Sequence, residues 1–202
     1  MNLKLNHLAI ALLTAGTLAA ISGCVPLMVG GAAMGAMVVS DRRTSGAQIE
    51  DETIELRAGS RVREALGESA HINITSYNRQ VLITGEVPTE AAKAKADEVI
   101  NTVPNVKSIV NELAVMGATS LPQRSADVLI TGKVKASMVD AKDLFVNIFK
   151  VVTERGTVYL MGRVTQQEAD RATAVARQTG GVQRVVRIFE IITDEELKRL
   201  KP

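Results

Sequence analysis

The sequence contains no tryptophan and few aromatic residues of any kind. Two tyrosines and three phenylalanines make an aromatic content of 2% in 202 residues. Proteins that hold single-stranded nucleic acid stack its bases on aromatic side chains, so the composition argues against a nucleic-acid partner. Histidine is equally scarce, and beyond the N-terminal segment His71 is the only one. We expect it to be structural, because no acidic or cysteine neighbour in the sequence has ligand spacing.

Sequence motifs for catalysis are also missing. The chain contains no nucleophile elbow, no phosphate-binding loop and no zinc-protease helix. The sequence therefore predicts no catalytic residue, no cofactor and no metal site. A hydrolase would have to use a site that the sequence does not reveal.

A single cysteine, Cys24, excludes an intramolecular disulfide bond. It follows a segment with a positive charge at Lys4 and an apolar run over residues 8–21. That run is too short to span a bilayer and is typical of an export signal. Because Ile-Ser-Gly-Cys resembles the lipobox of bacterial lipoproteins, the resemblance implies that residues 1–23 are removed and that Cys24 is acylated. The alternative is an ordinary secretory signal that happens to contain a cysteine.

The residues after Cys24 bear on location. Lipoproteins retained in the inner membrane typically have aspartate next, whereas this chain has Val25. The resemblance therefore implies an outer-membrane lipoprotein that faces the periplasm. Residues 25–39 are valine, glycine, alanine, methionine and other uncharged residues, too few to cross a bilayer. We interpret residues 24–45 as a lipidated tether, which either lies near the headgroups or forms an unstructured spacer.

An internal repeat organises the rest of the chain. The stretch VLITGEV at 81–87 recurs 77 residues later as VYLMGRV at 158–164. Each copy reads as a strand with a glycine near its end, where a missing Cβ usually marks a bulge or a close backbone approach. Each is followed by a helix start, and a second valine-rich strand closes each copy. The repeat predicts two copies of one small α/β module.

Hydrophobic periodicity gives each module the element order αββαβ. A right-handed crossover then predicts an α+β fold, in which a three-stranded mixed sheet has two helices on one face. Modules of this size bury too little surface alone, so we expect them to pack on one another. The predicted organisation is a signal at 1–23, the tether at 24–45, module one at 46–116, a linker at 117–124, module two at 125–192 and a charged tail at 193–202.

Particular residues mark the element ends. In module one the first helix buries Ile54, Ala58, Val62 and Ala65 and ends at Gly67. Turns are expected at 77–80 and 154–156, and the third strand of module one at 106–115. In module two the first helix covers about 126–139. Helix caps are predicted at Thr89, at Thr165 with Glu168, and at 193–196.

These residues resemble the BON domain family, small αββαβ modules named from an osmotically induced periplasmic protein and nodulation proteins. The resemblance covers most of the chain and rests on VLITGEVPTEA at 81–91, PNVKSIVNEL at 104–113 and ITGKVKA at 130–136. With the lipobox and tether, the chain is similar to dual-BON outer-membrane lipoproteins. That resemblance implies binding to an anionic phospholipid membrane, a role in envelope integrity and no catalysis.

Charge divides unequally between the modules, although the whole chain has a formal charge of only +2. Residues 46–120 hold seven basic and eleven acidic residues, a formal charge of −4. Residues 121–202 hold fourteen basic and ten acidic residues, a formal charge of +4. Module two is therefore the half that an anionic surface would attract.

The first helix of module two is the candidate lipid-binding site. At ~100° per residue, Ile130, Val134, Met138 and Ala141 share the face that the sheet can bury. The opposite side is apolar with a basic border, a pattern typical of interfacial helices. A helix packed between its own sheet and module one would also be apolar on both sides. The candidate lipid-binding residues are Val128, Leu129, Gly132, Lys133, Lys135, Ala136, Val139 and Lys142.

The preferred partner is thus an anionic phospholipid membrane. The competing hypothesis is a scaffold, in which the same helix or the acidic module one holds a protein of envelope assembly or cell division.

Overall fold

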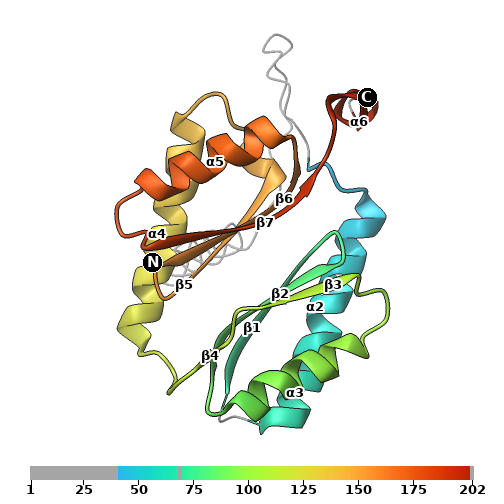
Figure 1. The fold of residues 1–202 in the computed structure, drawn as a ribbon, viewed down its shortest axis with the longest axis vertical. Helices are drawn as coiled ribbons and strands as arrows, with labels where there is room; N and C mark the ends of the chain where they lie inside the picture. The colour runs from blue at the N-terminus through green and yellow to red at the C-terminus, as the bar shows by residue number, and fades with distance from the viewer. Residues whose placement is uncertain (1–40, 68–69, 201–202) are drawn as a thin grey trace, which may run out of the picture. The chain divides into compact units, whose positions relative to one another are not determined.

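A computed structural model describes residues 41–67 and 70–200 (Figure 1). The predictions for Cys24, the signal and most of the tether lie outside these residues. Module one contains α2 (Ser45–Leu66), β1 (His71–Tyr77), β2 (Gln80–Val87), α3 (Glu90–Asn101), β3 (Ser108–Asn111) and β4 (Ala114–Val115). Module two contains α4 (Leu121–Asp140), the 3-10 turn η3 (Val146–Ile148), β5 (Phe149–Glu154), β6 (Thr157–Val164), α5 (Gln166–Gln178) and β7 (Arg184–Ile191), and is followed by α6 (Asp194–Leu200).

Both sheets are mixed, as predicted. β1 pairs antiparallel with β2, which pairs parallel with β3; β5, β6 and β7 repeat this arrangement. Within each module both helices lie on the same face of the sheet (Figure 1), because one apolar core joins residues from both helices and the central strand. The α+β class and the αββαβ order are therefore confirmed.

Module one departs from the expected three strands. Its last strand is interrupted, and the short β4 pairs separately with β2 to make a four-stranded sheet. At the break the Leu113 amide donates to the Asn111 side chain at 3.1 Å. This turn directs the Leu113 side chain into the helix-covered core, where it is buried. Burial of one leucine thus explains why a continuous strand over 106–115 does not form.

The predicted helix caps are present, but two other helix predictions are wrong: the start of α4 and the burial of Ala65. Thr89 caps α3, and Thr165 with Glu168 forms the predicted capping box of α5. α4, however, begins at Leu121 rather than near residue 126, so part of the expected linker is helical. Ser120 is its N-cap residue and Pro122 lies in its first turn, where proline is well tolerated. Ala65 is exposed rather than buried, because it lines a shallow depression between α2 and α3.

A buried aspartate in the first helix of each module holds the hairpin turn. The Asp51 carboxylate accepts the amides of Asn78 and Arg79, each at 2.7 Å. Asp127 likewise accepts the amides at residues 155 and 156, each at 2.8 Å. The central turn residues have positive φ in both hairpins, so these bonds stabilise a tight turn in which backbone amides would otherwise be buried without partners.

The repeated glycines permit a close approach between neighbouring strands. A Cβ on Gly85 would lie 2.0 Å from the carbonyl oxygen of His71, and one on Gly162 would lie 2.8 Å from that of Ile148. The two carbonyls occupy matching places in the repeat. The expected close backbone approach is confirmed at both positions.

The described residues form a single unit in which the free faces of the two sheets share an apolar cluster. Tyr77 and Leu82 of module one pack there with Tyr159, Met161 and Ile188 of module two. Central strands β2 and β6 are therefore apolar on both faces, which explains their nearly continuous hydrophobic sequences. As expected from their small size, the modules complete each other's burial.

Candidate functional site

The inner face of α4 fixes this helix to module two. Val134 and Met138 are fully buried, and Ile130 and Ala141 pack partly buried against the same core. Asp127, one turn earlier on the inner face, binds the hairpin turn. These contacts account for every inner residue predicted from the periodicity and leave the opposite side unused by the fold.

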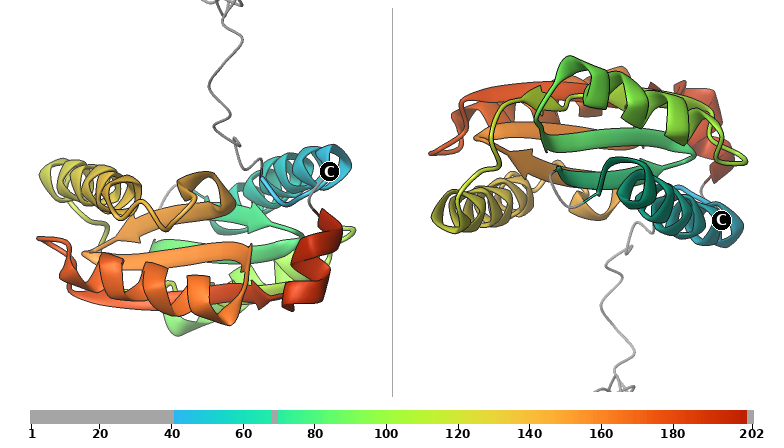
Figure 2. Two further views of the ribbon diagram at one scale, coloured as in Figure 1. Left: turned by 90° about the horizontal axis from the view of Figure 1, so that it is seen from above. Right: turned by 90° about the horizontal axis from the view of Figure 1, so that it is seen from below.

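The outer face of α4 is exposed along its length. Val128, Leu129 and Val139 have 71%, 66% and 57% of their surface accessible. Both views of Figure 2 show α4 as a projecting helix whose outer side meets no other element of the described chain. Packing against module one therefore does not explain its apolar character. All the predicted lipid-binding residues are exposed: Val128, Leu129, Gly132, Lys133, Lys135, Ala136, Val139 and Lys142.

Two more exposed apolar residues, one at each end of α4, were not in the predicted set. Leu121, 75% exposed, opens the helix, and Phe145, 46% exposed, follows it. Leu121 was missed because residues 117–124 read as a linker, although proline in a first helical turn could have revealed the earlier start. Phe145 lies in an irregular segment, where periodicity carries no information about exposure.

The lysines near the outer face make no ion pair with another described residue. Lys133, Lys135 and Lys142 are exposed, and none has an ion pair among residues 41–67 and 70–200. Lys150 differs, because its ammonium group lies 3.5 Å from the Glu55 carboxylate. The three lysines beside the apolar row can therefore meet an external anion without first breaking an internal contact.

Helix α2 offers an internal comparison, since Asp51 and Asp127 hold equivalent turns and so align the two helices. Their inner faces match in character, with Ala58 in the place of Val134. Their outer faces differ. Where α4 has Val128, Leu129, Ala136 and Val139, α2 has Glu52, Thr53, Ser60 and Arg63. At the position of Gly132, however, α2 has Leu56, which is 75% exposed. Folding of this module type consequently does not require apolar residues at those four outer positions.

A second group of polar residues lies where the modules meet. His71 Nδ1 is 3.0 Å from a Glu86 oxygen, and Arg155 donates to the other Glu86 oxygen at 2.7 Å. Glu154 accepts a hydrogen bond from Asn73 at 3.1 Å. Sequence spacing gives no sign of this cluster, because its members come from different strands and from both modules.

The pKa values of the two carboxyl groups in this cluster are shifted in opposite directions. Burial alone would raise the pKa of Glu86, but hydrogen bonds from Thr119, Arg155 and His71 outweigh it and lower that pKa. Burial raises the pKa of Glu154, and the nearby Glu86 carboxylate adds to the effect. The carboxyl groups of Glu86 and Glu154 thus favour opposite protonation states as the pH falls.

The same cluster contains the side chains best placed to hold a metal ion in the described part of the chain. One ligand atom from each of His71, Glu86 and Glu154 lies within 4.8 Å of the others. Arg155 and Thr119, however, already donate to Glu86. A cation would have to compete with the Arg155 guanidinium, so the arrangement favours a polar junction between modules.

Comparisons with known proteins agree with this two-module architecture. The BON domain family matches residues 51–117 and 126–192. The chain is 36% identical over 191 residues to "Outer membrane lipoprotein DolP" of Haemophilus influenzae, covering 93% of this chain and 97% of that protein. It is 32% identical over 154 residues to "21 kDa hemolysin" of Actinobacillus pleuropneumoniae, covering 75% and 79% of the two chains. It is also 29% identical over 121 residues to "Osmotically-inducible protein Y" of Escherichia coli, covering 58% and 60%. No helix in the described residues is long and apolar enough to span a membrane.

Proposed function

Because this chain belongs to the BON domain family, with one domain in each half, and is a lipoprotein of the outer membrane, we propose that module two binds anionic phospholipid through α4. The observation that carries the proposal is the exposed apolar outer face of α4, at positions where α2 is polar. The proposed function is binding without catalysis, and it supports the integrity of the envelope.

Two kinds of interaction contribute to the proposed binding. Burying a valine or leucine side chain fully contributes ~1.5–3 kcal/mol. Each lysine close to an anionic surface adds ~1 kcal/mol, which salt reduces. Ordering and desolvation offset part of this sum, so the apolar row and the lysines are both needed for measurable affinity.

Acylation at Cys24 makes a weak α4 contact sufficient. Several acyl chains hold a protein on a bilayer far more firmly than the marginal binding of one. Once the chain is held there, docking of α4 becomes an intramolecular step at high effective concentration. The anchor supplies residence on the membrane, and α4 supplies lipid selectivity and orientation.

Vesicle sedimentation of residues 39–202 tests α4 without the acyl chains. This fragment keeps Arg42 and Arg43, which bond to Glu168 and Asp51. We expect it to sediment with vesicles that contain phosphatidylglycerol and to remain in solution with pure phosphatidylcholine. The double variant Leu129→Asp with Val139→Asp should lose binding while its circular dichroism spectrum stays unchanged.

Matched variants separate the contributions. Ile49→Asp with Leu56→Asp places the same charges at exposed apolar positions of α2 and should leave binding intact. Lys133→Glu with Lys135→Glu should weaken binding and flatten its salt dependence. Equal losses from the α2 and α4 aspartate pairs would reject a specific role for α4. A wild-type fragment indifferent to vesicle charge would favour the protein scaffold instead.

The anchor has its own test. Cys24→Ala should abolish incorporation of labelled palmitate and release the protein from outer-membrane fractions. A variant that still takes up label and still fractionates with the outer membrane would contradict acylation at Cys24.

A further inference from the structure

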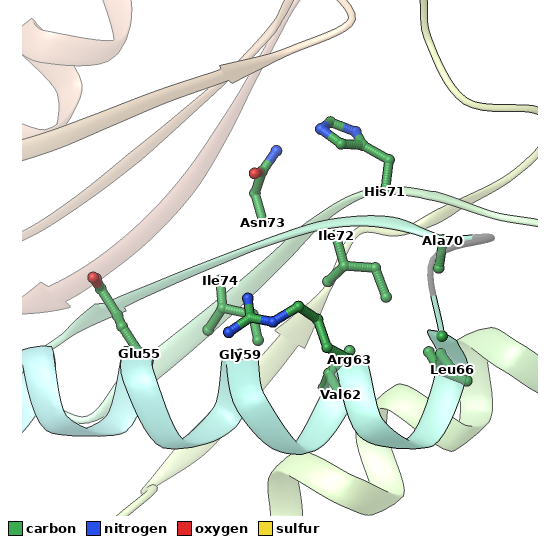
Figure 3. A pocket seen from close by; sticks show the side chains of 11 residues that line it. Glu55, Gly59, Val62, Arg63, Leu66, Ala70, His71, Ile72, Asn73 and Ile74 are labelled. Carbon is green, nitrogen blue, oxygen red and sulfur yellow. The ribbon is translucent and has the colours of Figure 1, made fainter.

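Module one contains a groove between α2 and the edge strand β1. Its volume is about 350 Å³, and its lining comes only from these two elements and the residues that follow α2. Figure 3 shows Ile72 and Ile74 directed from β1 toward α2, whereas His71 and Asn73 point the opposite way. The groove therefore has an apolar side formed by alternate residues of one strand.

The outer edge of β1 pairs with no other strand among residues 41–67 and 70–200. The strand pairs there with β2 alone, and the two-residue turn places Tyr77 opposite Gln80. In that register the amides and carbonyls of Ile72 and Ile74 point away from β2. The Ser76 amide confirms the direction, because it donates outward to Glu55 at 2.8 Å. The edge consequently presents main-chain donors and acceptors to an approaching strand.

On the side of α2 that faces the groove, Gly59 has no side chain and Arg63 carries a positive charge. Gly59 lies in the helical row that borders the groove, and the nearest atoms to a Cβ there would belong to the tip of Arg63, at 3.5 Å. Figure 3 shows the Arg63 guanidinium above Gly59, between α2 and β1. In residues 41–67 and 70–200 this guanidinium has neither an ion pair nor a hydrogen bond.

We propose that this groove binds an extended peptide segment of a partner protein, which adds to β1 as an antiparallel or parallel strand and places an acidic side chain against Arg63. Main-chain bonds to Ile72 and Ile74 supply the extended conformation, and an apolar side chain fits beside Gly59. A small ligand would leave the edge groups unsatisfied, whereas a strand pairs them. Glu55 also lines the groove, but it accepts the Ser76 amide and lies 3.5 Å from the Lys150 ammonium group. At the Arg63 end, the positive charge favours a carboxylate over an amine.

Module two differs at the equivalent place, between α4 and its edge strand β5. Lys135 stands where α2 has Gly59, and Thr131 stands where α2 has Glu55. The Thr131 hydroxyl donates to Thr153 at 2.7 Å, which links α4 directly to β5. Leu144 is buried in the module-two core after α4. The two modules therefore present different surfaces at equivalent strand edges, and the open one belongs to module one.

Peptides of defined sequence test the proposal on the full-length protein purified in detergent. The probes are fluorescein-labelled peptides of about seven residues, a usual strand length, that alternate valine and threonine. A single aspartate is moved through successive positions, and a matched series carries lysine instead. Fluorescence anisotropy should show binding for aspartate peptides at some positions and about tenfold weaker binding for the lysine series. Methylating the backbone nitrogens on one edge of the best peptide should abolish binding, and methylating the other edge should not.

Variants of α2 connect that binding to the groove. Gly59→Leu should fill the groove and reduce affinity at least about tenfold while leaving the thermal midpoint equal or higher, because leucine is the better helix former. Gly46→Leu makes the same change in the same helix, where only Thr44 lies within reach at 4.0 Å, and should not affect affinity. Arg63→Glu should reverse the preference from aspartate to lysine peptides, whereas Arg57→Glu, also exposed on α2, should not.

Three outcomes would overturn the proposal: no binding by any peptide, equal affinity in wild type and Gly59→Leu, or an unchanged charge preference in Arg63→Glu. Sedimentation equilibrium addresses the remaining occupant, a second copy of this chain. A wild-type dimer that Gly59→Leu dissociates, without peptide binding, would assign the edge to self-association and reject a peptide partner.

Discussion

Module one and module two share a fold and differ in what they expose. Both first helices bury an aspartate and an apolar row, and both hairpins turn at equivalent positions. Outside the core they diverge: α4 exposes Val128, Leu129 and Val139, while α2 leaves room for a groove at Gly59. Positions fixed by packing are therefore alike in the two modules, whereas their exposed positions differ.

The charge difference follows the same division. Module one is acidic and module two basic, with formal charges of −4 over 46–120 and +4 over 121–202. An anionic membrane attracts the second and repels the first. In the membrane-bound arrangement that we propose for module two, module one faces away from lipid and the groove beside β1 stays accessible to a protein. Substitutions at matched positions of the two modules test this difference.

The largest expected difference lies at the repeated glycines. Gly85 has a φ of 116° and a Cβ there would lie 2.0 Å from the His71 carbonyl, so Gly85→Val should cost more than about 4 kcal/mol and prevent folding of module one. Gly162→Val meets the Ile148 carbonyl at 2.8 Å with no positive φ and should cost ~1–3 kcal/mol. Thermal unfolding of residues 39–202 measures both.

Gly132→Ala provides the matched control, because no other atom lies within 4 Å of that position and alanine favours a helix. It should keep or raise the midpoint. An unchanged midpoint in Gly162→Val would show that its strand can move away from the Ile148 carbonyl at little cost.

Next in size are the aspartates that hold the turns. Asp51 accepts bonds from two turn amides, the Ser76 hydroxyl and Arg43, so Asp51→Ala should cost ~3–5 kcal/mol. Asp127 accepts two amides, and Asp127→Ala should cost ~1–3 kcal/mol. Urea unfolding compares them, with Glu52→Ala as the exposed control on the same helix. An equal loss of unfolding free energy in the two variants would mean that the bonds from Arg43 and Ser76 to Asp51 do not contribute to stability.

A smaller effect, of opposite sign in the two modules, concerns the carboxyl groups at their junction. Folding raises the pKa of Glu154, chiefly through burial, so its contribution to stability is present at low pH and is lost as the pH rises through the folded-state pKa. Glutamine cannot ionise. Glu154→Gln should therefore be more stable than wild type at neutral pH, and the advantage should disappear below the unfolded-state pKa of about 4.3.

Glu86 should behave in the opposite way. Burial opposes ionisation, but Thr119, Arg155 and His71 hold its pKa below the ordinary value, so its contribution is present at neutral pH and is lost on acidification. Glu86→Gln should destabilise at neutral pH, and its deficit should shrink as the pH falls. Thermal midpoints measured across pH would contradict the assignment if both variants shifted in the same direction.

The smallest effect on stability is expected on the outer face of α4. Giving it the residues of α2 through Val128→Glu, Leu129→Thr and Val139→Arg should change stability by no more than ~0.5 kcal/mol for each substitution. Val134→Glu, on the inner face, should unfold module two. A large loss from the outer substitutions would mean that the row packs against the protein after all.

The sequence predicted what depends on neighbouring residues. Local interactions between residues a few positions apart form both hairpins, the cap at Thr89 and the capping box at Thr165. All of these predicted features are present, and so is the repeated module. The exposure of the seven predicted residues that lie on α4 could be predicted because helical periodicity separates two faces without knowledge of the partner sheet, whereas Lys142 follows the end of the helix. Ala65 was misassigned because periodicity does not reveal whether another element covers the last turn.

Contacts between distant residues could not be read in this way. The turn amides that bond to Asp51 and Asp127 lie 27 to 29 residues away on the hairpins. The bond from Arg155 to Glu86 and that from Asn73 to Glu154 depend on how two sheets pack. The groove beside Gly59 requires both the strand register and the position of α2, so a glycine in a helix gave no hint of it.

Arg42 and Arg43 stand at the point where the folded unit begins, and each binds a different module. Arg42 makes a two-pronged contact with Glu168, both bonds at 2.7 Å, while Arg43 binds Asp51 at 2.8 Å and lies 4.2 Å from the Tyr77 ring. If Cys24 is acylated as we propose, a pull along the backbone would reach both modules at once, because each module has its own contact with this arginine pair. The tension would then be divided between two attachment points instead of acting on one end of α2.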